Sequence, residues 1–142
     1  MISNDLVIRE LCKKSFYDFL LEFWDVITTE PIQDNWHIKY LCDELEVVGL
    51  RVVDRKPKEY DLIINIPPAE SKSTICTILF PVWLWIKDPS LRIISGSYSS
   101  SLSMEHAAKS RDVIKSDKFR RLFDEFKIRR DSDNKSFYSN DK

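Results

Sequence analysis

DLIINIPPAESKSTICTILFPVWLWI, residues 61–86, is the stretch of this sequence that decides the predicted fold. An apolar run at residues 62–66 is followed by a short polar turn, and Lys72-Ser73-Thr74 then opens a longer apolar run. A short run of branched apolar residues is typical of a β-strand, and the longer second run has the length of a helix. We therefore predict a strand at 60–66, then a loop and a helix.

This order of elements predicts an anion-binding site. A loop that enters a helix presents unpaired backbone N–H groups and the positive end of the helix dipole. Lys72 is then expected to contact the β- and γ-phosphates of a nucleotide, and Ser73 to offer its hydroxyl to a magnesium ion. Thr74 would lie beside the α- and β-phosphates. On spacing alone, an ordinary turn with a solvated Lys72 is the alternative.

The loop departs from the usual phosphate-binding pattern G-x-x-x-x-G-K-[ST]. Ile66 and Ser71 occupy the two glycine positions, and Glu70 brings a carboxylate into the loop. Glycine lets the backbone approach phosphate closely, whereas a carboxylate repels it. The predicted nucleotide-binding residues of this segment are Pro68, Ala69, Glu70, Ser71, Lys72, Ser73 and Thr74.

Composition indicates one soluble globular unit. The chain has 142 residues, of which 43% are hydrophobic and 32% charged, and its net charge of −1 provides no overall basic field for nucleic acid. Its three cysteines lack the close pairs of metal sites and are expected to be buried thiols. The N-terminus lacks the pattern of a secretion signal, and the longest apolar run, at residues 75–86, is shorter than the ~20 residues of a membrane span.

Two helices are expected before residue 58. Six apolar residues within 14–28 follow the helical period and share one face: Phe16, Phe19, Leu20, Phe23, Trp24 and Ile27. We interpret this aromatic face as core. A second helix is expected from Asn35, with Trp36, His37 and Tyr40 in its first turn. Trp36 and His37 could stack on and hydrogen-bond a nucleotide base, although a packed helix start would have the same residues.

The remaining segments complete a predicted α/β fold. Residues 91–98 are expected to form a second strand, which with the preceding strand and helix makes a βαβ unit. Helices are expected at 99–116 and 117–124, and two short strands at 127–130 and 135–138. The prediction is a partial P-loop NTPase of the RecA/ASCE type, with parallel strands flanked by helices at 59–142, preceded by an N-terminal helical segment at 1–58.

The order of these segments resembles the N-terminal ATPase region of phage large terminase subunits, the motors that package DNA into proheads. Family members share a Trp-His-Ile-containing helix, matched by Trp36-His37-Ile38, and a strand ending in Ile-Pro-Pro before a loop ending in Lys-Ser, matched by residues 66–73. They continue with a Phe-Pro-x-Trp helix, here residues 80–83, and a strand closing in Ser-Tyr-Ser, here residues 97–99. The resemblance covers most of the chain.

This resemblance implies an ATP-binding part of a terminase, with Lys72 in the catalytic position and ATP and Mg²⁺ as cofactors. It implies double-stranded DNA, the portal and the small terminase subunit as partners, with no membrane, in the cytoplasm of an infected or lysogenic bacterium. Terminase ATPases need an acidic pair after a later strand to bind magnesium and activate water, and a nuclease domain follows. This chain shows neither, so we expect the front part of a terminase, either a truncated gene, a split gene or an excerpt of a longer one, which does not hydrolyse ATP alone.

Two other functions are open. The chain could be a non-catalytic assembly module, or one half of a split gene, that docks on the remainder of the terminase. Alternatively, its basic C-terminal quarter, with ten bases against six acids in residues 109–135, could bind nucleic acid. The basic residues considered for that role are Arg111, Lys115, Lys118, Arg120 and Arg121.

Overall fold

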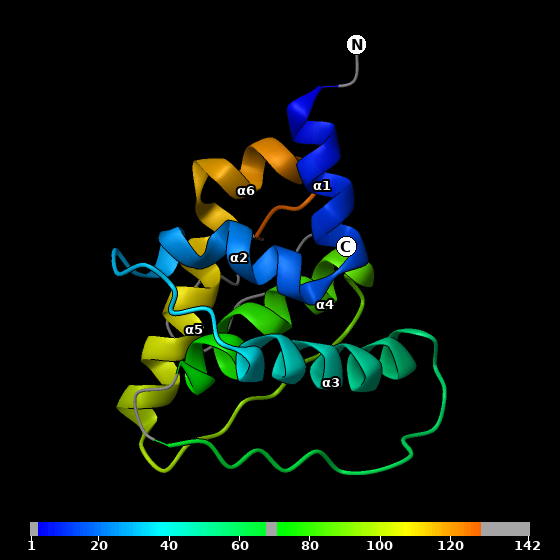
Figure 1. Ribbon diagram of the computed structural model, residues 1–142, viewed down its shortest axis with the longest axis vertical. Helices are drawn as coiled ribbons and strands as arrows, with labels where there is room; N and C mark the ends of the chain where they lie inside the picture. The colour runs from blue at the N-terminus through cyan, green and yellow to red at the C-terminus, as the bar shows by residue number, and fades with distance from the viewer. Residues whose placement is uncertain (1–2, 68–70, 129–142) are drawn as a thin grey trace.

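The computed structural model describes residues 3–67 and 71–128, and helices dominate this part of the chain (Figure 1). In chain order they are α1 (Asn4–Lys14), α2 (Phe16–Ile27), α3 (Trp36–Val53), the π-helix η1 (Thr74–Leu79), α4 (Phe80–Lys87), α5 (Ser100–Lys115) and α6 (Asp117–Leu122). None of these helices combines the length and apolar character that crossing a bilayer requires.

The predicted α/β fold with parallel strands is wrong, because residues 3–67 and 71–128 contain no sheet. Both expected strands, at 60–66 and 91–98, are extended chain that runs past α3 (Figure 1). Within the described chain, however, no backbone–backbone hydrogen bond joins 60–66 or 92–98 to another segment. A β-strand requires a neighbouring strand that it hydrogen-bonds with, and neither segment has such a neighbour in the described part of the chain.

Buried and exposed side chains alternate along residues 60–66, and this alternation explains how the segment stays extended without a partner strand among the described residues. Leu62, Ile64 and Ile66 are half-buried against the helices, whereas Ile63 between them is 80% exposed. Successive side chains of extended chain point to opposite sides, so one side packs and the other remains in water. In the second segment only Leu91 is buried, and Ile94 is 97% exposed.

The predicted amphipathic helix at 14–28 is confirmed as α2, which begins at Phe16 and lies at the centre of the core. Five of the six residues predicted for its buried face are buried, namely Phe16, Phe19, Leu20, Phe23 and Trp24, and Ile27 is half-buried. Ser15 caps the helix by accepting a hydrogen bond from the Asp18 backbone N–H at 3.1 Å. Core residues come both from 1–58 and from 59–128, so the helices before and after residue 58 pack on each other.

The predicted second helix is confirmed as α3, and it crosses α4 at close range. Gly49 permits this approach, since a Cβ atom there would come within 2.8 Å of side-chain atoms of Phe80 and Leu84. Phe80 also meets Phe16 edge to face, with ring centroids 5.1 Å apart. The contact brings α2, α3 and α4 together.

Residues 72–87 form one continuous helical segment whose middle part is the π-helix η1. Pro81 lies at the start of α4 but inside this continuous segment, where it has no N–H for the usual helical hydrogen bond. The wider π turn precedes it, and π-helical turns are frequent at functional sites. Buried Trp83 then donates its indole N–H to the Cys12 carbonyl at 2.9 Å and so ties α4 to α1.

The helices expected at 99–116 and 117–124 are confirmed as α5 and α6. Each begins with a serine cap: Ser99 accepts from the Leu102 N–H at 3.4 Å and Ser116 from the Phe119 N–H at 3.1 Å. The two short strands expected at 127–130 and 135–138 lie outside the described residues, except for residues 127 and 128.

Candidate nucleotide-binding site

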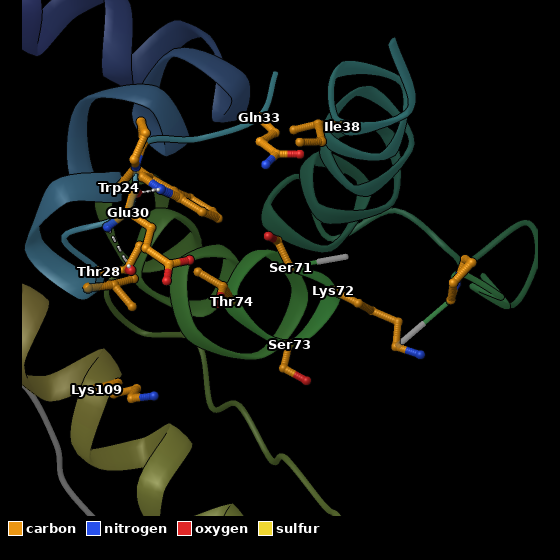
Figure 2. Close-up of a pocket in the computed structure, with 13 residues that line it drawn as sticks. Trp24, Thr28, Glu30, Gln33, Ile38, Ser71, Lys72, Ser73, Thr74 and Lys109 are labelled. Carbon is orange, nitrogen blue, oxygen red and sulfur yellow. Dashed lines mark hydrogen bonds between the residues drawn. The ribbon is translucent and has the colours of Figure 1, made fainter. Parts of the chain in front are cut away.

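A cavity of about 610 Å³ lies where the α2–α3 connection faces the start of the 72–87 helix and α5 (Figure 2). This volume is within the range of small-molecule sites, which is about 300–1,000 Å³. The lining residues come from three separated segments: Trp24, Ile27, Thr28, Glu30, Pro31, Gln33 and Ile38, then Pro67 and Ser71 to Thr74, and finally Lys109.

The Lys-Ser-Thr run forms one wall of this cavity. Ser71 has a φ of 59°, the left-handed region that favours glycine, and its carbonyl accepts the Ile75 N–H at 3.0 Å. This conformation turns the chain sharply into the helix. Lys72 and Ser73 are exposed in the first turn and Thr74 is half-buried. In Figure 2 the side chains of Ser71 and Thr74 point towards the opposite wall, while Lys72 extends away from it.

The opposite wall is built by the end of α2 and the connection that follows. Trp24 donates its indole N–H to the Glu30 carbonyl at 2.9 Å, and the Glu30 backbone N–H donates to Thr28 Oγ1 at 3.2 Å. These bonds hold the connection in a compact turn. Figure 2 shows the Trp24 ring and the Gln33 amide projecting towards the Ser71 side. This wall therefore offers an aromatic ring and an amide within one cavity.

Charge is unevenly distributed in the cavity. Its lining includes two cations, Lys72 and Lys109, and one carboxylate, Glu30. Figure 2 places Glu30 beside Thr74, and Ser73 on the same side of the helix as Lys109. An anionic ligand is thus attracted to either lysine and repelled by the Glu30 carboxylate.

The structure brings together four of the sequence-predicted site residues: Ser71, Lys72, Ser73 and Thr74 line one cavity. Pro68, Ala69 and Glu70 lie outside the described residues.

Trp36 and His37, expected near a nucleotide base, are not in the cavity lining, which includes their neighbour Ile38 instead. Successive helical residues point about 100° apart, so when Ile38 faces inward its neighbours turn elsewhere. Trp36 is 81% exposed, and its ring lies 6.1 Å from that of His37 and 6.5 Å from that of Tyr40.

Sequence reasoning missed the residues of the opposite wall and α5. We assigned Trp24 to the core because its spacing places it on the apolar face of the helix. It is indeed buried, with 9% of its surface exposed, but it also lines the cavity. Gln33 carried only the signal of a polar connection, and Lys109 was the first residue of a basic segment. Nothing in their sequence neighbourhoods connects them to Lys72, because the cavity is formed by helix packing.

Magnesium fits this site only together with a phosphate ligand. In residues 3–67 and 71–128, no group of three or more His, Cys, Asp or Glu side chains could hold a metal ion. Ser73 supplies a hydroxyl, and magnesium is commonly held by few protein oxygens together with substrate phosphates. Ser73 could therefore hold a magnesium ion that a bound nucleotide brings with it.

Some of the basic residues considered for nucleic acid are engaged in ion pairs. Lys118 binds Asp25 at 2.8 Å and also donates to the Glu22 carbonyl at 2.8 Å, and Arg121 lies 3.3 Å from Asp5. These contacts fasten α6 to α1 and α2. Lys118 and Arg121 therefore have a structural role in this fold, and acidic partners offset their charge.

The expected burial of the thiols is confirmed for two of the three cysteines. Cys12 and Cys42 are buried and Cys76 is half-buried, and none of the three forms a disulfide. Burial raises the pKa of Cys12 and Cys42 to about 12 and that of Cys76 to about 11. Thiols that remain protonated are poor nucleophiles, so the structure gives them a packing role.

No family model, curated protein or solved structure matches this chain.

Proposed function

We propose that this chain binds ATP in the cavity beside Ser71–Thr74, as the ATP-binding part of a DNA-packaging terminase. The observation that carries the proposal is that Lys72 and Ser73 line one cavity of about 610 Å³ together with Trp24 and Gln33. The proposal rests on these side chains and on the terminase resemblance. It requires no strand before the loop.

The two ends of the cavity suit the two ends of a nucleotide. Lys72 and Ser73 offer an ammonium group and a hydroxyl to phosphate oxygens. Trp24 offers a ring edge or face for stacking, and the Gln33 amide can both donate to and accept from a base. The phosphates would then lie away from Glu30.

Hydrolysis is not part of the proposal. Activating water for attack on a phosphate requires a well-placed base, and Glu30 is the only carboxylate among the described lining residues. Its backbone belongs to the wall where we place the base of the nucleotide. We therefore expect binding without turnover by this chain alone.

Titration of the purified protein with a fluorescent ATP analogue, with and without Mg²⁺, tests this function. We expect saturable binding that strengthens with Mg²⁺ and weakens at least about tenfold in Lys72→Gln, since a charge-assisted contact contributes about 1.5–3 kcal/mol. Lys39→Gln, a lysine of α3 in an ion pair with Asp43, is the matched control. Equal binding by the wild type and Lys72→Gln would refute the assignment.

A second candidate function, a non-catalytic module that docks on the remainder of a terminase, is favoured by the exposed extended segments. Ile63, Ile94 and Tyr98 are 80%, 97% and 97% exposed, which is unusual for large apolar side chains unless a partner covers them. Mixing the protein with a separately expressed C-terminal part of a terminase tests this function. A stable complex that Ile94→Lys disrupts would support docking, and its absence would count against it.

A further inference from the structure

Lys109 extends the proposed site beyond the Lys-Ser-Thr run. It belongs to α5, 37 positions after Lys72, and yet it lines the same cavity. Figure 2 shows its amine directed to the side of the helix on which Ser73 projects. Two cations from distant segments thus line the cavity, on the two sides of Ser73 in this view.

The backbone that carries Lys109 is held against η1 by its neighbour. Ser110 is 2% exposed, and its Oγ donates to the Ile78 carbonyl of η1 at 3.0 Å. This buried bond fixes the position of α5 relative to the cavity wall. The Lys109 side chain is 43% exposed and free to change its rotamer above that fixed backbone.

The present partner of Lys109 is easily exchanged. Its amine lies 2.7 Å from Glu105 one helical turn away, and the Glu105 side chain is 56% exposed. Exposed i,i+4 pairs contribute little to stability, because water and side-chain entropy offset the attraction. A polyphosphate carries more negative charge than one carboxylate and can take this amine from Glu105.

We infer that Lys109 is a second phosphate-binding cation, which exchanges Glu105 for the terminal phosphates and makes the cavity select triphosphate over monophosphate ligands. This inference rests on the proposed function and names its ligand class. Lys72 and Lys109 lie on either side of Ser73, so a single phosphate can satisfy one amine, whereas a polyphosphate chain can reach both. The Glu30 carboxylate, which lies beside Thr74, repels a phosphate chain placed next to it.

The test compares the affinities of ATP, AMP and inorganic tripolyphosphate for the full chain by isothermal titration calorimetry. In Lys109→Gln, ATP and tripolyphosphate affinity should fall about tenfold or more while AMP affinity is unchanged, and Glu105→Gln should bind both polyphosphates several-fold more tightly. Lys39→Gln is again the control, because Lys39 forms an i,i+4 pair of the same 2.7 Å length with Asp43, outside the cavity.

The outcomes separate the inference from the proposed function. Binding of tripolyphosphate that depends on Lys109, without any binding of ATP, would keep the inference and overturn the nucleotide assignment. ATP binding that is equal in the wild type and Lys109→Gln would overturn the inference alone. Circular dichroism of each variant confirms that a loss of affinity is not a loss of folding, and absence of binding to every probe by the folded wild type would overturn both.

Discussion

The Ser110 hydroxyl donates to the backbone carbonyl of Ile78 at 3.0 Å and so joins α5 to the π-helical turn. Ser110 is a buried polar side chain, 2% exposed, and its Oγ also lies 3.1 Å from the His106 carbonyl. A hydroxyl has one hydrogen, so the two carbonyls share it. This bond positions η1, which follows the Lys-Ser-Thr run, against the helix that carries Lys109.

Ser110→Ala should lower the free energy of unfolding by about 1–3 kcal/mol, because it leaves a buried carbonyl without its side-chain donor. Urea denaturation measures the change. Asp112→Ala, an exposed position on the same helix, should stay within about 0.5 kcal/mol of the wild type. Equal stabilities of the two variants would show that the Ser110 bond contributes nothing net.

Trp83→Phe should also destabilise the fold, by about 1–3 kcal/mol, since it removes the indole N–H that satisfies the Cys12 carbonyl. Trp36→Phe is the matched control, because Trp36 is 81% exposed, and we expect its effect to stay within about 0.5 kcal/mol. Thermal and urea unfolding of both variants check the contrast. A larger loss for Trp36→Phe would contradict the packing described above.

Ser71→Gly should raise the free energy of unfolding by about 0.5–1 kcal/mol. Ser71 has a φ of 59°, and left-handed backbone costs an L-residue about 1–2 kcal/mol, which glycine avoids. Part of this gain is lost because glycine has more conformational entropy in the unfolded chain. Ser73→Gly is the opposite control: its φ of −66° is helical, so glycine there should destabilise by about 0.5–1 kcal/mol. Urea denaturation of the pair tests both signs.

Tyr17 should titrate abnormally at high pH. Its hydroxyl donates to Asp34 at 2.5 Å, and this bond, with the nearby charge, raises the pKa of Tyr17 from 10.0 to about 12. A raised folded-state pKa means that the bond contributes stability fully below about pH 10 and loses it as the pH rises towards 12. NMR titration of labelled tyrosine should show the shift in the wild type and its reduction in Asp34→Asn. Identical titration of the two proteins would refute the contact.

Most helices of this protein were predictable because their signals are local, but α1 (Asn4–Lys14) was not predicted. The apolar period of α2 identified its buried face, and Ser15 caps its start. The strands were not predictable in the same way. Residues 60–66 have the branched composition of a strand and are indeed extended, but a sheet also requires a partner segment, which composition does not reveal.

Four of the 13 described lining residues of the candidate site followed from the sequence. Ser71, Lys72, Ser73 and Thr74 were identified by their order before an apolar run, and they do share one cavity. Trp36 and His37 were placed near it by their residue types, yet the rotation of α3 directs Ile38 inward instead. A shift of one residue on a helix turns a side chain by about 100°, which residue type alone cannot resolve.

The sequence by itself determined where α2, α3, α5 and α6 lie, which face α2 buries and where the chain enters the 72–87 helix, because hydrogen bonds and periodicity within a helix connect residues three or four positions apart. Tertiary structure alone decided that 60–66 and 92–98 have no partner strand within residues 3–67 and 71–128. It also brought Trp24, Gln33 and Lys109 to the Lys-Ser-Thr run. These relationships join segments tens of residues apart, and only the packing of side chains between helices sets them.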